Sequence, residues 1–481
     1  MSVQSPPTLQ KLARQTLLRN EAVIISSLEE LPTVLFPALF KEAFEGRHSK
    51  LVKEMVTTWP FPCLPVGALM KTPNLETLQA VLEGVDMRLT RDIHHSKGKL
   101  QVLDLRNVHH TFWNIWADEE DGSCSSESLD DNPVVKVLPR YALRHKLKVV
   151  TELCLRPRLD EAQACFLKWA QQRKDFLHFC CTKLKIWAMP MDFIREILNV
   201  FHPEHIEELE LNTEWNVFQL AQFAPFFGQM RNLRKLLLAP LYKNVFKIAN
   251  RTGEREDKCV KGFISMFSKF NCLQHLSLSG VHFLIDHMDQ VFRSLMTPLV
   301  KLSIKHYRIS QKDLDSFSCC QSLFHLKHLE MRGVTLSTLD IMPLRSLVEK
   351  VADNLQTLDL QGCRMKDYQL NALLPALTRC SQLAKINFYN NDFSMAILKD
   401  FLQHTANWSK INVEQYPAPL ECYDELAHVC RERFAQLCLE LMDTLGTIRQ
   451  LKNISFATNM CHKCGEQCVY GRENRTCSCR L

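Results

Sequence analysis

The cysteine-rich C-terminal segment holds the densest group of side chains that could bind a metal. Five cysteines lie between residues 461 and 479, and the first two form the sequence Cys461-x-x-Cys464-Gly465. A glycine at that place frees backbone N–H groups to face sulfur, which suits tetrahedral zinc–thiolate coordination. The Cys477-x-Cys479 pair is closer in sequence than the usual second pair of a zinc knuckle, so a tail of free thiols is the alternative. The predicted zinc ligands are Cys461, Cys464, Cys468 and Cys477.

The sequence offers no catalytic motif. It lacks a glycine-rich phosphate loop, a nucleophile elbow and an H-E-x-x-H helix. His94-His95 and His109-His110 are adjacent pairs, and adjacent side chains diverge on a helix and face opposite sides of a strand. We therefore predict that the chain is not an enzyme and needs no cofactor beyond the possible structural zinc.

The N-terminal segment carries the first of two patterns typical of docking helices. Thr8 is a suitable N-cap, and Leu9, Leu12, Ala13 and Leu17 share one helical face. A small residue between large apolar ones lets a partner approach closely. The segment resembles the elongin-binding BC box, and the predicted elongin contacts are Thr8, Leu9, Ala13 and Leu17.

The second pattern, at residues 31–39, resembles a cullin-2 box, apolar-Pro-x-x-apolar-x-x-x-apolar. Pro32 suits the first turn of a helix, whereas Pro37 would lie inside that helix and kink it. The predicted cullin contacts are Leu31, Pro32, Leu35 and Leu39. The alternative is that the N-terminal helices only cap a repeat array, and the two interpretations are compatible.

The strands and helices of most of the chain are indicated by a six-residue pattern, apolar-x-x-apolar-x-apolar. This pattern recurs mostly every 25 to 29 residues. A period of this length is the signature of a leucine-rich repeat, in which each unit is a short strand followed by a helical return. Helix periodicity lies between the copies, with Asp286 and Ser394 as predicted N-caps. Copies begin at Leu100, Val150, Cys181, Ile206, Leu233, Leu273, Leu299, Leu326, Leu355, Leu383, Trp408 and Leu451.

The repeat predicts an α/β leucine-rich-repeat horseshoe solenoid with a parallel sheet on the concave side and a helical N-terminal cap. We expect the cap at 1–95, the solenoid at 96–456 and the cysteine-rich tail at 457–481. The solenoid is interrupted by an acidic loop at 118–132 and a charged insertion at 241–260.

Polar strand positions of the concave sheet are free to carry specificity, so we expect them to bind a target protein. The predicted target contacts are Gln274, His275, Ser277, Lys327, His328, Glu330, Gln356, Thr357 and Asp359.

Composition limits the other classes. The net charge of +6 in 481 residues is too dilute for nucleic-acid binding. There is no secretory signal and no apolar run long enough to span a membrane, so we expect the cytoplasm and nucleus. In those compartments most of the 20 cysteines would be free thiols.

Several longer stretches resemble the PRAME family of mammalian germ-line leucine-rich-repeat proteins. They are PPTLQKLARQTLLRNEAV, LEELPTVLFPALFKEAF, LQVLDLRNV, HIEELELN, the turn at 59–62, and the Cys461-x-x-Cys464-Gly465 tail. The resemblance implies a monomeric substrate-recognition adaptor of a cullin-2–RING ubiquitin ligase, linked through elongins B and C. It also implies roles in transcription, differentiation, apoptosis and proliferation. The alternative is an interaction scaffold without a ligase, acting as a nuclear transcriptional corepressor.

Overall fold

The computed structural model describes residues 9–70, 74–90, 98–115, 146–213, 215–239, 254–447, 453–461, 464–472, 474–475 and 477. Contacts divide the chain into two compact units. Unit 1 comprises Met1–Leu184 and Met189–Ile206, and unit 2 comprises Lys185–Ala188 and Glu207–Leu481. Among the described residues, no helix is long and apolar enough to cross a membrane.

The N-terminal part of unit 1 is helical. Its core is aromatic: the Phe40 ring packs 5.2 Å from the Trp59 ring and 5.8 Å from the Trp113 ring. Helices α4 and α5 approach closely at Gly84, where an added Cβ would lie 2.6 Å from the Lys53 carbonyl oxygen. The helices are α1 (Leu9–Arg19), α2 (Glu21–Ser27), α3 (Phe36–Glu45), α4 (Ser49–Thr57) and α5 (Leu75–Thr90).

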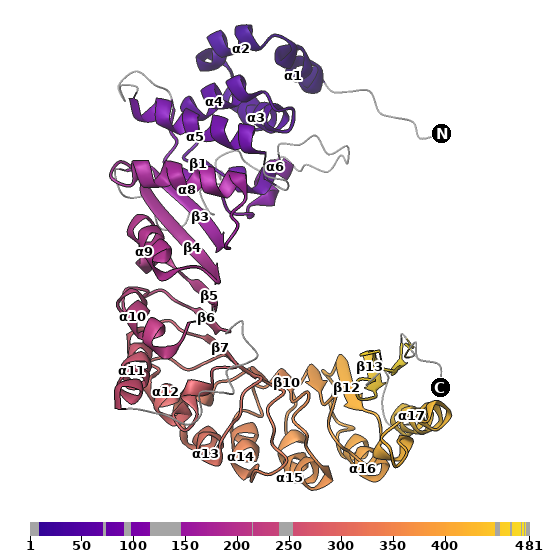
Figure 1. Cartoon of the computed structure of the whole chain (residues 1–481). Helices are drawn as coiled ribbons and strands as arrows, with labels where there is room; N and C mark the ends of the chain where they lie inside the picture. Colours follow the sequence, from indigo (N-terminus) through magenta and orange to yellow (C-terminus); the bar gives the residue numbers. More distant parts are fainter. Residues whose placement is uncertain are drawn as a thin grey trace, which may run out of the picture. The chain divides into compact units, whose positions relative to one another are not determined.

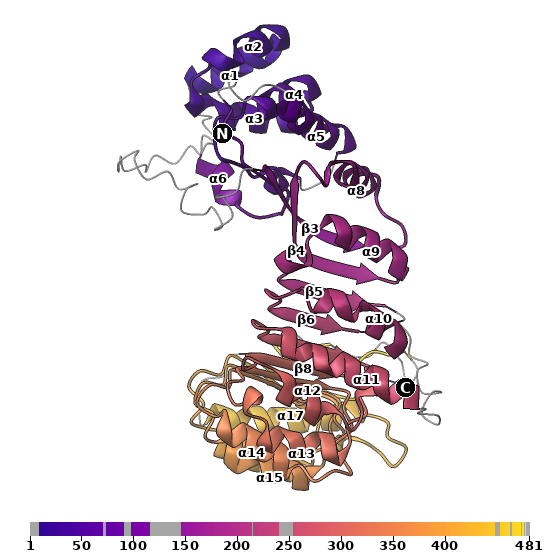
Figure 2. The same cartoon turned by 90° about the vertical axis from the view of Figure 1, so that its left-hand side faces the viewer.

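The rest of unit 1 alternates strands and helices. Strands β1, β2 and β3 pair in parallel, with Leu64 opposite Leu103 and Leu103 opposite Val149. The His178 N–H at the start of β4 donates to the Leu147 carbonyl at 3.0 Å, which joins β4 to the β3 segment. Figures 1 and 2 show α9 beside β4. The elements are β1 (Cys63–Leu64), β2 (Val102–Asp104), α6 (His110–Ile115), β3 (Lys148–Leu155), α8 (Glu161–Arg173), β4 (His178–Trp187), α9 (Met191–Val200) and the 3-10 turn η4 (Pro203–His205).

Unit 2 repeats one strand–helix cycle. In Figure 1 its strands line the inner side of a bend and α12 to α16 lie on the outer side. The strands are β5 (Glu208–Asn212), β6 (Lys235–Leu238), β7 (His275–Ser279), β8 (Lys301–Lys305), β9 (His328–Arg332), β10 (Thr357–Asp359), β11 (Lys385–Asn387), β12 (Val413–Pro417), β13 (Asn453–Ala457) and β14 (Val469–Gly471). The helices are α10 (Val217–Phe227), α11 (Glu254–Ser265), α12 (Met288–Ser294), α13 (Gln311–Cys319), α14 (Met342–Lys350), α15 (Asp367–Leu377), α16 (Met395–His404) and α17 (Arg431–Gly446).

The register of unit 2 stacks the middle apolar residue of each pattern on that of the next. Each leucine of this row is 1% exposed or less, and burying one such side chain contributes about 1.5–3 kcal/mol. The row continues through Ile386 to Glu414, so the predicted copy starting at Trp408, with Ile411 in the middle, is out of register by three residues. The buried carboxylate of Glu414 accepts a hydrogen bond from the Tyr416 hydroxyl at 2.7 Å. Its leucines are Leu209, Leu236, Leu276, Leu302, Leu329 and Leu358.

The predicted leucine-rich-repeat solenoid with a parallel inner sheet is confirmed. Strands β5 to β13 pair in parallel, and β14 pairs antiparallel with β13. The acidic loop at 118–132 lies outside the described residues, and of the charged insertion residues 254–260 begin α11. The predicted boundaries at 95 and 456 stay predictions.

The two predicted helix caps had different outcomes. Ser394 accepts a hydrogen bond from the Ile397 N–H and caps α16, as expected. Asp286 does not cap α12, because its backbone is left-handed (φ 67°) and His287 takes the N-cap position. Instead Asp313, from the next repeat, accepts the N–H groups of Asp286 and Met288 at 3.1 Å each.

Candidate functional site

Helix α1 presents an apolar face to solvent. Leu9 is 86% exposed, Leu12 is 44% exposed and Ala13 is also exposed. The opposite side of the helix is anchored to α3, because the buried Arg14 side chain donates to the Glu42 carboxylate at 2.8 Å. Leu17 is half-buried at the edge of the exposed face, and Thr8 lies outside the described residues. The predicted elongin contacts Leu9, Ala13 and Leu17 therefore lie on or beside one accessible face.

The cullin-box segment differs from the predicted single helix. Pro32 is the N-cap of a short 3-10 turn at Thr33–Leu35, and α3 begins only at Phe36, so Pro37 lies in its first turn and causes no internal kink. Pro32 is exposed, while Leu31 and Leu35 are half-buried. The prediction for Leu39 is wrong, because its side chain is fully buried in the core of unit 1.

The predicted target contacts lie along strands β7, β9 and β10. The residues before these strands are exposed, and the first residue of each strand is half-buried. The pairing of neighbouring strands aligns residues of the inner face in two rows. The first row runs Lys235, His275, Lys301, His328, Thr357 and Lys385. The second row runs Ser277, Ser303, Glu330, Asp359 and Asn387. The exposed residues are Gln274, Lys327 and Gln356.

Asp359 is a correction to the predicted target contacts. Its side chain is 1% exposed, and both nitrogens Nε and Nη2 of Arg332 donate to its Oδ2 at 2.9 and 2.6 Å. The Asn387 amide donates to the same oxygen at 3.2 Å. The carboxylate is therefore used within the sheet, and Arg332, which is 39% exposed, is the group that a partner can reach.

Cations from β8 surround Glu330. Lys301 lies 2.5 Å from one carboxylate oxygen, and Ser303 donates to the other at 3.1 Å, with Lys305 3.9 Å away. Burial raises the pKa of Glu330, but the hydrogen bond and charge of Lys301, with Ser303 and Lys305, lower the pKa by more. The net pKa of Glu330 is below the ordinary value, so its carboxylate is ionised at neutral pH.

Burial and the neighbouring lysines also lower the pKa values of the two histidines in the first row. Burial lowers the pKa of His275, and the charges of Lys235 and Lys301 lower it further. Burial and then Lys301 likewise lower the pKa of His328. Both rings are therefore neutral at pH 7 and can donate or accept hydrogen bonds. The sequence analysis missed Lys301, Lys305 and Arg332, although their positions in the repeat mark them as inward-facing.

The tail brings three of the four predicted zinc ligands together. The sulfur atoms of Cys461, Cys464 and Cys477 all lie within 4.8 Å of one another, and Cys464 and Cys477 are 3.1 Å apart. Gly465 adopts the left-handed backbone (φ 73°) that the Cys-x-x-Cys-Gly turn requires, and its N–H donates to the Cys461 carbonyl at 2.8 Å. The Cys468 sulfur is outside this group and accepts the Cys477 N–H at 3.3 Å. Three thiolates fit zinc, and metal binding itself stays a prediction.

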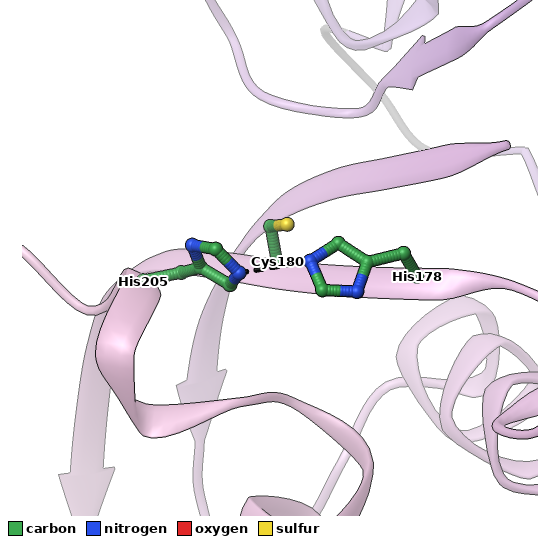
Figure 3. Close-up of side chains that lie close together, drawn as sticks. All are labelled: His178, Cys180 and His205. Atoms are coloured by element: carbon green, nitrogen blue, oxygen red, sulfur yellow. Dashed lines mark hydrogen bonds between the residues drawn. The ribbon is translucent and has the colours of Figure 1, made fainter. Parts of the chain in front are cut away.

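A second group of metal-ligating side chains lies in unit 1, where the sequence analysis expected none. The donor atoms of His178, Cys180 and His205 all lie within 4.8 Å of one another. Figure 3 shows the three side chains close together. The spacing of these residues in the sequence could have indicated the group. His178 and Cys180 are two residues apart on a strand, and His178 and His205 are one repeat apart.

Comparison with known proteins decides the family. Residues 6–113 match the PRAME N-terminal domain, and residues 147–479 match the PRAME C-terminal domain. The chain belongs to the PRAME family. It is 44% identical to human PRAME family member 8 over 482 residues, which is 100% of both chains. It is 41% identical to the mouse preferentially expressed antigen in melanoma-like protein 7, over 97% of both chains.

Among solved structures, the yeast Rad7 and Elc1 complex gives a match covering 89% of this PRAME-family chain and 97% of that chain. The sequence identity is 14% and the TM-score is 0.39. A similarity this slight carries no argument about partners. The fold and the family are those of a repeat protein that presents surfaces for binding.

Proposed function

We propose that this chain is the substrate-recognition subunit of a cullin-2–RING ubiquitin ligase. In this proposal α1 binds elongin C, the Leu31–Leu35 segment contacts the cullin, and the inner face of unit 2 binds a target protein. The observation that carries the proposal is the exposed apolar face of α1. Membership of the PRAME family supports it independently.

The α1 face has the chemistry of a helix-docking surface. Leu9 and Leu12 expose apolar area to water, and burying one leucine side chain against a partner is worth about 1.5–3 kcal/mol. Ala13 lies between Leu9 and Leu17 and lets a partner approach closely. The Arg14–Glu42 ion pair fixes the rotation of the helix, so this face is presented rather than folded back.

The segment after α2 extends the surface toward a second partner. Val34 is 52% exposed and Pro32 is exposed, whereas Leu31 and Leu35 are half-buried. Leu39 plays no part, because it is buried. The cullin contact is therefore assigned to Leu31, Pro32 and Leu35, with Val34 added.

The inner face of unit 2 suits a target that carries acidic groups. Lys301, Lys305 and Arg332 reach this face from β8 and β9, and each is at least 35% exposed. The carboxylates of Glu330 and Asp359 are 14% and 1% exposed, so a partner meets more positive than negative charge there. Ligation requires no chemistry from this chain, because holding the target raises its local concentration near the conjugating enzyme.

The test is capture of purified elongin B/C by the full chain. Leu9→Asp places a charge in the centre of the apolar face and should abolish capture, and Ala13→Trp should do the same by steric block. Gln15→Asp is the matched control, since it adds the same charge at an exposed position of α1 that is not one of the predicted contacts. It should bind like the natural protein.

Unaltered capture by Leu9→Asp and Ala13→Trp would refute the adaptor function. If the natural protein captures neither elongin B/C nor cullin-2, the alternative of a scaffold or nuclear corepressor without a ligase takes its place. Circular dichroism of each variant should match the natural protein, because Leu9 and Ala13 contribute to no core.

A further inference from the structure

We propose that His178, Cys180 and His205 form a binding site for a zinc-class transition metal in unit 1. The proposal does not depend on the adaptor function. The site is separate from the cysteines of the tail, which belong to unit 2.

The three donor atoms already lie near the geometry that a metal needs. The Nε2 atoms of His178 and His205 are 2.9 Å apart, and all three donor atoms are within 4.8 Å of one another. Ligand bonds of about 2.0–2.3 Å in a tetrahedral site place donor atoms roughly 3.3–3.6 Å apart. Small side-chain rotations would therefore admit the ion, with no change of backbone. Figure 3 shows the two rings edge to edge, with Cys180 beside them.

The repeat architecture holds the ligands in place. His178 and Cys180 are two residues apart on β4 and so project from the same side of the strand. His205 ends the short turn η4, and its N–H donates to the His202 carbonyl at 3.1 Å. The His202 ring stacks on His178 with centroids 5.1 Å apart and planes inclined by 19°, which limits how far the His178 ring can rotate.

Cys180 forms the buried wall of the site. Cys180 is 1% exposed and packs with the apolar side chains of Cys63, Val102 and Val150. One wall of the site is thus apolar, while the two histidines are half-buried and reachable from solvent. Such an environment excludes competing water from one side and still leaves an entry path.

The donor set selects the class of metal. Two imidazoles and a thiolate are borderline-soft ligands, which suit zinc and its neighbours rather than calcium or magnesium. Glu204 could supply a fourth ligand if its side chain turns, since one of its oxygens lies 3.7 Å from the His205 Nε2 atom but outside the group of mutually close donor atoms. Bound metal would tie the start of β4 to η4, which precedes the next repeat. We therefore assign it a structural role.

The other grouping of this kind is weaker. Asp289, Cys319 and Cys320 also approach within 4.8 Å, but the Arg293 guanidinium donates to the Asp289 carboxylate at 2.7 Å. An arginine in that position opposes a cation.

The test uses the full chain carrying Cys461→Ser, Cys464→Ser and Cys477→Ser, so that the tail contributes no thiolate to the measurement. After incubation with zinc and desalting, elemental analysis should find one zinc ion per chain. Replacing zinc with cobalt(II) should give the absorption bands of a tetrahedral ion with a thiolate charge-transfer band. His205→Ala should lose the metal, and Cys180→Ser should lose the thiolate band.

His325→Ala is the matched control, because it removes an exposed histidine of unit 2 that is not one of the three donors. It should keep the zinc and the thiolate band. In the presence of a chelator, the midpoint of thermal unfolding should be the same for the tail variant with and without His205→Ala. Zinc should raise this midpoint only for the tail variant that keeps His205. The proposal is overturned if the tail variant binds no zinc, or if its zinc and cobalt spectrum persist in both His205→Ala and Cys180→Ser.

Discussion

Asn391 offers the sharpest test of how each repeat is held to the next. Its side chain is 3% exposed and makes three hydrogen bonds to backbone groups. Its amide donates to the carbonyls of Leu360 and Phe388 at 2.9 Å each, and its oxygen accepts the Met365 N–H at 2.9 Å. Cys363 occupies the same place one repeat earlier, where its thiol contacts the Met331 carbonyl at 2.9 Å.

The stability that Asn391→Ala should remove follows from these contacts. Three buried backbone groups would lose their side-chain partner, and each unsatisfied group costs about 1–3 kcal/mol. Entry of water into the vacated space reduces the sum, so we expect the free energy of unfolding to fall by about 3–5 kcal/mol. Asn391→Cys keeps one contact to the Leu360 carbonyl, as Cys363 does to Met331, and should cost about 1–2 kcal/mol less than the alanine variant.

The assay is urea unfolding followed by circular dichroism. Because long repeat arrays can lose cooperativity, hydrogen exchange of peptides across 355–420 should accompany it and report the local opening of β10 to β12. Faster exchange should be confined to the repeats on either side of Asn391. An alanine variant within about 1 kcal/mol of the natural protein, or a cysteine variant less stable than the alanine one, would refute the reasoning.

The remaining predictions concern unit 1 and the inner face of unit 2. Gly67→Ala should destabilise unit 1 by at least about 2 kcal/mol in thermal or urea unfolding, because its Cβ would lie 2.2 Å from the Arg106 carbonyl oxygen. Leu39→Asp should unfold unit 1, whereas Val34→Asp should leave circular dichroism unchanged and weaken only cullin-2 capture; equal effects of both would contradict the corrected assignment. The pKa of Glu330 is lower in the folded chain than in the unfolded chain, where it is about 4.3. The stabilisation from this carboxylate is therefore present above pH ~4.3 and is lost as the pH falls through the lower pKa of the folded chain. The free energy of unfolding of Glu330→Gln should therefore fall less below pH ~4.3 than that of the natural protein. The same pH profile in both proteins would count against the Lys301–Glu330 pair.

The fold was predictable because one signal is repeated along the chain. The leucines of the six-residue pattern, such as Leu276, Leu329 and Leu358, are buried to within 1%. A single pattern of this kind is ambiguous, but its renewal at a constant period requires stacking of equivalent units. Cys363 and Asn391 occupy equivalent places of this period, 28 residues apart.

The individual site residues were less predictable, for two physical reasons. Leu39 matches a short motif, but burial depends on what packs against the helix, and here Leu39 lies in an aromatic-rich core. Asp359 occupies an inward strand position, but the neighbouring strand supplies Arg332, which draws the carboxylate into the sheet. Motifs within one segment contain neither kind of information.

A solenoid supplies that missing information through its period, because residues one repeat apart become neighbours on adjacent strands. Several of the interactions that matter join residues 27 apart in sequence: Glu208 with Lys235, Ser303 with Glu330, Arg332 with Asp359, and His178 with His205. The Asp286 N–H reaches Asp313 across the same interval. Searching the sequence at this spacing, rather than within short windows, would have paired the charges of the inner face. It would also have placed His205 beside the His178-x-Cys180 strand, which is the arrangement that a metal site requires.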